Sequence, residues 1–434
     1  MRNFTLLTAL FLAAPAMATD APMFRGNLQH TGTYAGSGVA QFSKVKWKFH
    51  TKGSVISSPA IVAGVAYFGS VDGNLYAVGL ASGVEKWKFA TTSRITSSPA
   101  VDAGVVFFGS YDGNFYAVDG ATGKLKWKFK TDGEKRFAAK RLHGSQPVNE
   151  TMPDPFDCYL SSPSVSGGAV FFGSGDGNIY SLDAVTGNLN WKFQTGDVVH
   201  ASPALADGTL FIGSWDSFFY ALDAATGREK WRFKTGEDNV IHNQVGIQSS
   251  ATVADGLVYF GCRDSNLYAL DAKTGEKKWA LNNKGSWVIT SPAVRDGKVY
   301  FGTSDTSLFT VVDARSGRSL FSLKAGGWPI FASPAIAGNF AYLGTQDGKL
   351  TALDLNAQKT AWSFQTDASK ANLAAFSKPE GGPDYAAAFA DDFYDSMIVG
   401  VVKMYATGSI LSSPVVVDEV IYFGSTDGNL YAIQ

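Results

Sequence analysis

The sequence predicts an all-β fold, namely a single eight-bladed β-propeller of four-stranded antiparallel blades. Similar segments recur about every 40 residues, which is a typical period for propeller blades. Each segment contains four short apolar runs, and the two ends of the chain hold complementary parts of one segment. The composition agrees, because 47 glycines and an aromatic content of 13% suit many short strands joined by tight turns.

The first 18 residues have the pattern of a secretory signal peptide. Arg2 precedes an apolar run from Phe4 to Ala14, and Ala16-Met17-Ala18 offers the small residues after which signal peptidases cut. The run is shorter than the roughly twenty apolar residues that cross a bilayer. No cysteine follows the expected cut to carry a lipid. We therefore expect a mature chain of residues 19–434 that is periplasmic or secreted and does not span the membrane.

Each of the eight segments opens with a serine, which is followed by proline in all but one of them. These serines are Ser58, Ser98, Ser162, Ser202, Ser250, Ser291, Ser333 and Ser413, of which Ser250 precedes alanine. Two intervals between them are much longer than the rest, so we expect insertions at about residues 132–159 and 367–408. The rest of the mature chain is expected to form one domain, because repeats of this kind bury their apolar faces against their neighbours.

The second segment shows the expected blade most clearly. Its four apolar runs are Ser98–Val101, Val105–Gly109, Phe115–Val118 and Leu125–Phe129. Asp112-Gly113 separates the second run from the third, and Gly123 stands before the fourth, as hairpin turns with positive φ require. The fourth run alternates apolar residues with lysines, which predicts a half-solvated strand at the outer edge of the blade.

The chain ends predict how the ring closes. The last segment stops after its third run, Leu430–Ile433, whereas a fourth run without a segment of its own, Val45–Phe49, stands near the beginning. We expect these two runs to pair. Their pairing would close the ring and remove the open edges that an incomplete sheet exposes.

Charge and cysteine content exclude some classes of protein. The net charge is −1 and the basic residues are scattered, which argues against a nucleic-acid-binding surface. No Cys-x-x-Cys-His motif for c-type haem occurs. The two cysteines, Cys158 and Cys262, fall in blades that are not adjacent, so the sequence leaves open whether they form a disulfide.

A second repeated pattern joins the third and fourth runs. The spacing Ala-x-Asp-x-x-x-Gly-x-x-x-Trp is intact at Ala117–Trp127, Ala221–Trp231 and Ala269–Trp279. It resembles the tryptophan-docking motif of propellers of the pyrroloquinoline quinone (PQQ) type, and Met23–Gly32 resembles the first segment of many such proteins. This family includes the outer-membrane assembly factor BamB and PQQ-dependent alcohol dehydrogenases. The resemblance covers nearly the whole mature chain and implies the same propeller.

The docking tryptophans are expected to be structural. Each is large enough to cover the peptide planes of a neighbouring blade, and the glycine of the motif permits that close approach. They are Trp47, Trp87, Trp127, Trp191, Trp231, Trp279 and Trp362. We expect the eight recurring aspartates to bond turn amides: Asp72, Asp112, Asp176, Asp216, Asp264, Asp305, Asp347 and Asp427. A residue that recurs in most blades does not mark a single site.

The two insertions are expected on one face of the disc. Because strands alternate in direction, the fourth-to-first and second-to-third connections lie together, and both insertions are fourth-to-first connections. The opposite face should carry only short turns. Long loops on a rigid scaffold commonly bind ligands, so the functional site is expected on this loop-rich face.

Residues that do not repeat from blade to blade stand out in the connections of the loop-rich face. The candidates for binding a ligand or cofactor are Arg94, His200, His242, Asn243, Gln244, Arg263, Trp287 and Trp328, with Trp215 and Gln248 beside them. Aromatic rings with a few cations and amides suit a flat ligand that is polar or anionic. No residue is assigned a catalytic or metal-binding role.

The insertions differ in composition. The first contains Lys135-Arg136, Lys140-Arg141 and several prolines, which predicts an extended loop able to reach a partner or to fold over the channel. In the second, apolar residues recur at three- and four-residue steps between Tyr385 and Tyr405. This pattern fits an amphipathic helix lying across the propeller, and equally a loop packed locally on the disc.

Two functions remain open. One is a scaffold that binds a ligand or a protein through the loop-rich face, which the lack of haem, zinc and nucleophile motifs favours. The other, implied by the resemblance, is a PQQ-dependent dehydrogenase that oxidises an alcohol or sugar with PQQ and Ca²⁺ in the funnel. In that case Trp287 or Trp328 would stack on the quinone, and Arg94 or Arg263 would meet its carboxylates.

Overall fold

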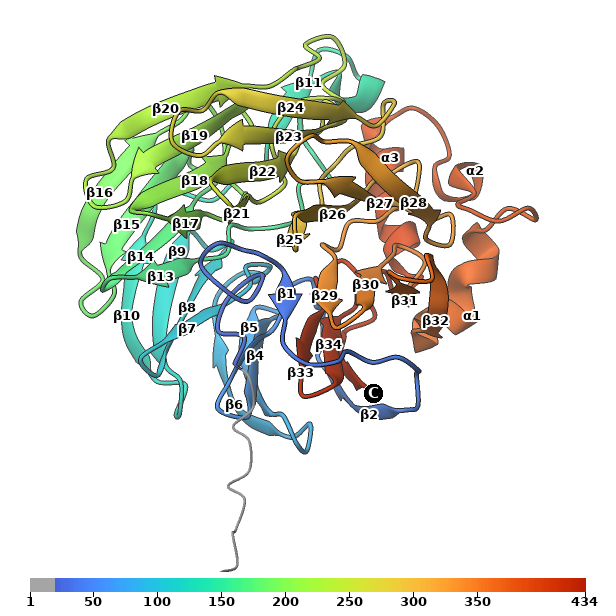
Figure 1. The fold of residues 1–434 in the computed structure, drawn as a ribbon, viewed down its shortest axis with the longest axis horizontal. Coiled ribbons are helices and arrows are strands. Elements are labelled where there is room, and N and C mark those ends of the chain that lie inside the picture. The colour runs from blue at the N-terminus through green and yellow to red at the C-terminus, as the bar shows by residue number, and fades with distance from the viewer. Residues whose placement is uncertain (1–19) are drawn as a thin grey trace, which may run out of the picture.

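Eight four-stranded antiparallel sheets radiate from a common axis in the computed structural model (Figure 1). The structure describes residues 20–434, so the predicted signal peptide lies outside the described residues. In each blade the first strand lies at the axis and the fourth at the rim. The predicted all-β, eight-bladed propeller is confirmed.

The blades follow one another in chain order. Blade 1 consists of β3 (Ala60–Val62), β4 (Val65–Gly69), β5 (Asn74–Gly79) and β6 (Glu85–Ala90), and blade 2 of β7 (Ala100–Asp102), β8 (Val105–Ser110), β9 (Asn114–Asp119) and β10 (Leu125–Lys130). Blade 3 consists of β13 (Ser164–Ser166), β14 (Ala169–Gly173), β15 (Asn178–Asp183) and β16 (Leu189–Gln194), and blade 4 of β17 (Ala204–Ala206), β18 (Thr209–Gly213), β19 (Phe218–Asp223) and β20 (Glu229–Lys234). Blade 5 consists of β21 (Thr252–Ala254), β22 (Leu257–Gly261), β23 (Asn266–Asp271) and β24 (Lys277–Asn282), and blade 6 of β25 (Ala293–Arg295), β26 (Lys298–Gly302), β27 (Leu308–Asp313) and β28 (Ser319–Lys324). Blade 7 consists of β29 (Ala335–Ala337), β30 (Phe340–Gly344), β31 (Lys349–Asp354) and β32 (Lys359–Gln365), and blade 8 of β33 (Val415–Val417), β34 (Val420–Gly424), β35 (Asn429–Ile433) and β2 (Val45–His50).

The pattern of apolar and polar residues differs between the inner strands and the outer strand of each blade. The second and third strands are apolar on both sides and are almost wholly buried between neighbouring blades, as β4 and β5 show. The fourth strand alternates, so that β10 buries Trp127 and Phe129 partly and leaves its lysines exposed. This alternation matches a strand that has the blade on one side and water on the other.

The two chain ends complete blade 8, as predicted. Strand β2 pairs antiparallel with β35, and Trp47 lies opposite Ala432. Beside this pair, the backbone N–H groups of Ser43 and Lys44 donate to the carbonyl of Gln434 at 2.6 and 2.9 Å. The ring is therefore closed by hydrogen bonds between residues almost 400 positions apart in the sequence, without a covalent link.

The recurring serines form a second ring at the axis. In each blade the backbone N–H of the serine donates to the hydroxyl of the next blade's serine, at 2.8 to 3.1 Å. The circle is complete, since Ser413 donates to Ser58. A serine in this position satisfies a buried backbone group that has no strand partner, which accounts for its recurrence in every blade.

The outer tryptophans join consecutive blades at the rim. The indole N–H of Trp127 donates to the carbonyl of Ala184 at 3.1 Å, and its ring lies over Gly187, where a Cβ would approach ring atoms to 2.6 Å. The other six docking tryptophans donate to a neighbouring carbonyl in the same way. Trp362 uses the carbonyl of Val39 from the N-terminal segment, because the chain ends before blade 8 has formed the corresponding turn.

Six of the eight turn aspartates make the same set of bonds. Asp112, for example, accepts from the N–H of Asn114 at 3.0 Å and from the hydroxyl of Tyr116 at 2.7 Å. Asp305 and Asp347 differ, because threonine replaces the tyrosine in blades 6 and 7. Asp347 instead pairs with Lys349 at 2.9 Å, which leaves Asp305 as the turn aspartate with the fewest bonds.

The face opposite the insertions is less simple than the sequence analysis expected. Residues 21–34 cross it and close the axis there (blue in Figure 1), bonding to the first strands of several blades and adding β1 (Thr33–Tyr34) parallel to β29. The guanidinium of Arg25 is buried and donates to the carbonyls of Pro292 and Pro334 at 3.1 and 2.6 Å. The prediction that this face carries only short turns was wrong, because the sequence analysis gave residues 21–34 no position in the fold.

The two cysteines are not bridged. Cys158 and Cys262 are free and buried, and they lie in different apolar clusters. Burial raises the pKa of the Cys158 thiol to about 12 and also raises the pKa of the Cys262 thiol well above its usual value. Both thiols are therefore protonated at neutral pH and have little of the thiolate that reacts with oxidants.

Both insertions are folded. Insertion 1 (residues 132–159) contains β11 (Ala138–Lys140), the short helix η1 (Leu142–Gly144) and β12 (Thr151–Pro153). Insertion 2 (residues 367–408) contains α1 (Asp367–Asn372), η2 (Leu373–Phe376), α2 (Tyr385–Ala388) and α3 (Tyr394–Tyr405), so a helix does form within the periodic segment. None of the helices in residues 20–434 has the length and apolarity to cross a membrane.

Candidate functional site

Insertion 1 fills the mouth of the channel on the loop-rich face. The ring of Phe137 stacks on Trp215, with centroids 4.6 Å apart and an interplanar angle of 11°. Phe156 packs edge-on against Trp287 and Phe331, with centroid distances of 5.7 and 6.4 Å. The aromatic side chains that the propeller presents at the mouth are therefore covered by the protein's own chain.

Arg263 occupies the space between two of these rings. Its guanidinium carbon lies 4.5 Å from the ring centroid of Trp215 and 4.1 Å from that of Trp287. One terminal nitrogen of Arg263 lies 2.5 Å from Asp154 of insertion 1, and Nε donates to Gln248 at 3.2 Å. The arginine and the carboxylate are both wholly buried, so this is a desolvated ion pair inside a tryptophan sandwich.

Asp154 also binds His143, which lies in the same insertion. Nε2 of His143 is 3.1 Å from the Asp154 carboxylate, and its Nδ1 is 2.9 Å from Asn243 of the loop between β20 and β21. Burial would raise the pKa of Asp154, but the charges of Arg263 and His143 hold it well below its usual range. The carboxylate stays ionised and links insertion 1 to blade 5.

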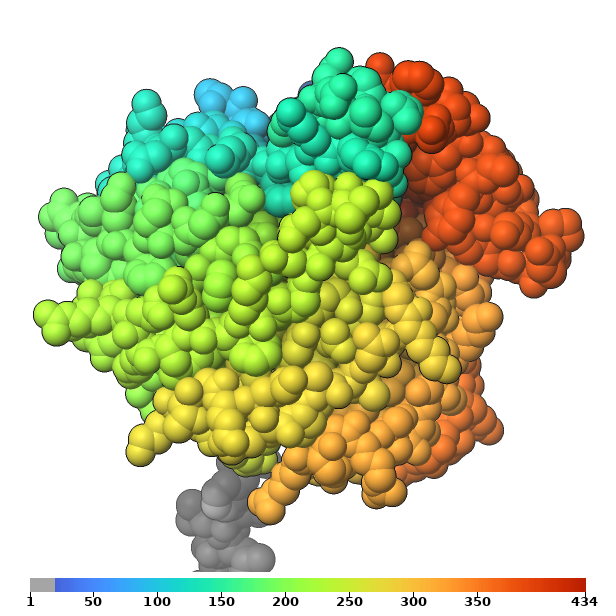
Figure 2. Space-filling view, turned by 90° about the horizontal axis from the view of Figure 1, so that it is seen from above, coloured from blue at the N-terminus to red at the C-terminus, as the bar shows by residue number. Residues whose placement is uncertain are grey.

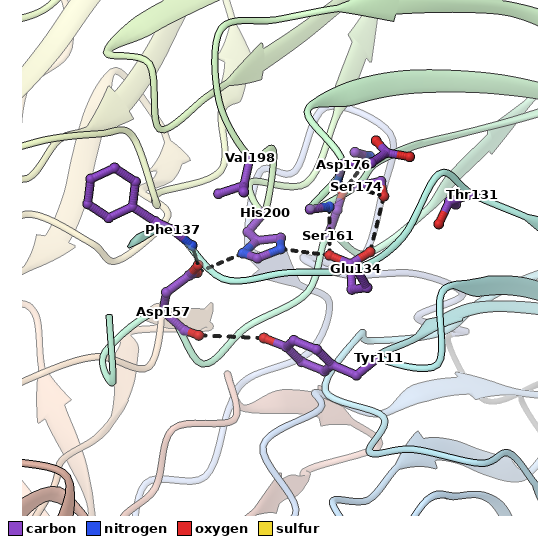
Figure 3. Close-up of polar contacts among 12 residues, drawn as sticks. Tyr111, Thr131, Glu134, Phe137, Asp157, Ser161, Ser174, Asp176, Val198 and His200 are labelled. Carbon is purple, nitrogen blue, oxygen red and sulfur yellow. Dashed lines mark hydrogen bonds and ion pairs between the residues drawn. The ribbon is translucent and has the colours of Figure 1, made fainter. Parts of the chain in front are cut away.

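A second buried ion cluster holds both ends of insertion 1 (Figure 3). His200, from the connection between β16 and β17, lies 2.8 Å from Glu134 and 2.7 Å from Asp157. Glu134 also accepts from the N–H of Gly175, and Asp157 from that of Phe137. Burial opposes a charge on the His200 ring, but the charge of Asp157 and the hydrogen bonds to both carboxylates outweigh it and raise the pKa of His200 to about 10. At neutral pH the ring is an imidazolium that donates to both carboxylates.

Replacing His200 with glutamine should loosen insertion 1. Without the imidazolium, Glu134 and Asp157 are left without their shared cation, so we expect trypsin to cut faster after Lys135, Arg136, Lys140 and Arg141. The measurement is limited proteolysis with mass-spectrometric identification of the first cuts. The same replacement at His242, which is not in an ion pair in the part of the chain that the structure describes, is the control.

The ion cluster around His200 makes the stability of insertion 1 depend on pH. The pKa of His200 is about 10 in the folded protein against an ordinary value of 6.5, so its stabilising contribution is complete below pH 6.5 and declines as the pH rises towards 10. The wild-type insertion should therefore become easier to cleave across this range, after correction for trypsin's own pH dependence with an unfolded peptide. A flat wild-type profile, or the same slope in the His200→Gln variant, contradicts this role.

The remaining sequence candidates do not converge on one point. Arg94 lies over the ring of Tyr111 at 3.9 Å, and Trp328 packs against Ala388 and Met404 of insertion 2. His242 borders a shallow groove on the outer side of insertion 1, and Gln244 bonds through its backbone carbonyl to Asp238. The structure thus brings Arg263, Trp287 and Asn243 together, and places His200 under insertion 1.

A cavity of about 690 Å³ lies beside the filled mouth, between the two insertions. Figure 2 shows insertion 1 (teal) and insertion 2 (orange-red) side by side with a hollow between them. The insertions are joined by hydrogen bonds from Tyr394 N to Gln146 O and from Gln146 N to Asp392 O, each 2.9 Å. The cavity is lined by His143 and Phe156 of insertion 1, by Tyr385, Phe389, Val401, Met404 and Tyr405 of insertion 2, and by the connections of blades 5 to 7.

The residues at the mouth do not fit PQQ with a calcium ion. Trp287, one of the two tryptophans expected to stack on the quinone, lies against the guanidinium of Arg263 instead, with Trp215 on the other side of it. That guanidinium, which was the candidate partner for quinone carboxylates, is already paired with Asp154. Within residues 20–434, His, Cys, Asp and Glu side chains do not gather in a group of three that could hold a metal ion.

Sequence reasoning missed the acidic residues of insertion 1. Glu134, Asp154 and Asp157 carry the ion pairs that seal the mouth, yet the insertion was judged by its basic residues and prolines. A usable signal was present, because the chain has only five histidines, of which His143 lies within insertion 1 and His200 follows the next outer strand along the chain. These two histidines, together with the acidic residues of insertion 1, indicate ion pairs inside the protein.

Solved structures with the same architecture include an outer-membrane assembly factor and two dehydrogenases. BamB from Moraxella catarrhalis is 18% identical, with 90% of this chain and 99% of that chain covered and a TM-score of 0.64. A europium-containing methanol dehydrogenase is 15% identical, with 96% and 98% covered and a TM-score of 0.68. The quinohemoprotein alcohol dehydrogenase from Comamonas testosteroni is 15% identical, with 96% and 81% covered and a TM-score of 0.69. At these identities the likeness shows the fold alone.

Sequence comparison assigns the family. No curated protein is similar enough in sequence to count as a relative. The family profile described as "Outer membrane protein assembly factor BamB" matches residues 37–154, 157–364 and 280–392, which together span most of the propeller. The recurring serines, docking tryptophans and turn aspartates described above lie mostly within these matches. The chain therefore belongs to this family of PQQ-type β-propellers.

Proposed function

We propose that this protein is an exported binding module that takes a ligand into the cavity between its two insertions. The observation that carries the proposal is the cavity itself, which has about 690 Å³ of space and lies on the loop-rich face. This volume is within the range of small-molecule sites, roughly 300–1,000 Å³. It is lined by rings and apolar side chains together with hydroxyl and amide side chains.

A binding function is favoured over quinone-dependent oxidation because insertion 1 fills the mouth of the channel. Insertion 1 places Asp154 against Arg263 and Phe137 against Trp215, so the groups that would orient a flat cofactor bond to the protein itself. Displacing insertion 1 would break two buried ion clusters at once. A ligand that enters the neighbouring cavity needs no such rearrangement.

A cavity-filling substitution tests the proposal. Val401 is buried and lines the cavity, whereas Val399 on the same helix is 52% exposed and does not line it. We expect the neutral probe N-phenyl-1-naphthylamine to gain fluorescence with the wild-type protein and with Val399→Trp. With Val401→Trp the affinity should fall about tenfold or more, because the larger side chain occupies the space. Equal titration curves for the two variants would overturn the proposal.

Reconstitution separates the proposal from the dehydrogenase alternative. The purified protein is incubated with PQQ and Ca²⁺, and both stoichiometric binding and dye reduction with a panel of alcohols and sugars are measured. We expect neither. Stoichiometric binding together with substrate-dependent dye reduction would replace the binding proposal by the quinoprotein one.

A further inference from the structure

The lining of the cavity combines apolar and polar groups. Insertion 2 contributes Phe389, Val401 and Met404, and the propeller adds the rings of Trp287 and Phe331. Met and Val side chains adapt to ligands of varied shape, and aromatic rings add contact area. These side chains suit a bulky aliphatic or aromatic group of a ligand.

Polar groups of two lining side chains have no hydrogen-bond partner within residues 20–434. Gln346 is only 5% exposed, and its backbone is bonded to Pro329, Thr407 and Ser409, but its side-chain amide makes no hydrogen bond there. The indole N–H of Trp287, a residue 8% exposed, has no acceptor either. These polar atoms are open to the cavity, so a ligand that enters it can bond to them in place of water.

Two opposite charges border the same cavity and do not neutralise each other. Lys284 lies between β24 and β25, Asp305 lies in the turn between β26 and β27, and both are exposed. Neither makes an ion pair within the described residues. Like Asp347, Asp305 lacks the tyrosine of the other six turns, and within the described residues its carboxylate accepts a side-chain hydrogen bond from the hydroxyl of Ser304 alone, at 2.7 Å.

We infer that the cavity binds a small zwitterion, an amino acid or short peptide with an apolar side chain. This inference rests on the proposed function and names its ligand class. The ligand's carboxylate would meet Lys284, its ammonium group would meet Asp305, its side chain would lie against insertion 2, and its polar backbone would bond to Gln346 and Trp287. A polyanion such as a quinone tricarboxylate would gain from Lys284 but be repelled by Asp305.

Titration calorimetry with a dipeptide and its capped forms tests the inference. The probes are leucylphenylalanine, its N-acetyl derivative, its C-terminal amide and the doubly capped form. We expect the zwitterion to bind best, and removal of either charge to weaken binding about fivefold, the upper end for a partly solvated ion pair. Lys284→Met should abolish the preference for the free carboxylate, and Asp305→Asn the preference for the free ammonium group.

Charge-matched controls come from the opposite face. Lys298 and Asp296 lie in or beside the turn between β25 and β26, away from the cavity, and Lys298→Met and Asp296→Asn should leave all four affinities unchanged. If the naphthylamine probe binds but the four peptides bind equally or not at all, the ligand class is wrong and the binding proposal stands. If neither the probe nor any peptide binds, both fail.

Discussion

Replacing Arg263 with methionine should lower the protein's free energy of unfolding by about 3–5 kcal/mol, because the substitution leaves the buried carboxylate of Asp154 without its arginine partner. Asp154 would remain ionised among aromatic rings with His143 as its neighbour. Methionine keeps most of the arginine stem and still packs between Trp215 and Trp287, so the loss reports the charge and not a cavity. Chemical denaturation with tryptophan fluorescence measures it.

Two comparisons isolate the ion pair. Lys192 and Asp132 are joined at 3.0 Å on the surface, and Lys192→Met should change stability by about 1 kcal/mol at most. The double variant Arg263→Met with Asp154→Asn should be more stable than Arg263→Met alone, because no charge is then left unpaired. A loss for Arg263→Met no larger than for Lys192→Met would mean that water reaches Asp154 and the mouth is open.

Much of the fold could be predicted because the sequence repeat indicates the number of blades and the strands within each blade. A serine, a turn aspartate and an outer tryptophan return at a nearly constant spacing, and each has one local physical task that a single sequence reveals. The pairing of β2 with β35 could be inferred because blade 8 lacks a strand and the N-terminal region has one to spare. The segment at residues 21–34 could not be placed, because its bonds go to first strands scattered along the chain.

The site was harder to predict because it is made by parts that do not repeat. Arg263 and Trp287 could be recognised as exceptions to the blade pattern, but the partner of Arg263 is Asp154, more than one hundred residues away in a long insertion. Similarly, Lys284, Asp305 and Gln346 border a common cavity that is also lined by residues of insertion 2. Loop conformation of this kind depends on tertiary contacts that local patterns do not encode.

A chain that begins at residue 51 should not form a stable propeller. It lacks β2, so β35 becomes an open edge although all five of its residues are buried in the intact protein. It also lacks Val39, whose carbonyl accepts from the indole of Trp362. In addition it lacks residues 21–34, the axial segment, which contains Arg25. We expect aggregation, or a thermal transition that is broad and far below that of the chain beginning at residue 20.

Moving the missing strand to the other end separates ring closure from the other losses. Residues 45–50 are attached after Gln434 through a copy of the turn Ala224–Arg228, in which Arg228 takes the place of Lys44, so that β2 forms a hairpin with β35 as in the other seven blades. Because this variant still lacks the axial segment, any recovery reports the outer strand alone. We expect a soluble monomer with a cooperative transition, since the graft removes the exposed edge without adding a new contact elsewhere. Failure of the graft, with recovery on adding back residues 20–42 instead, would show that the axial segment and not the strand pair holds the ring together.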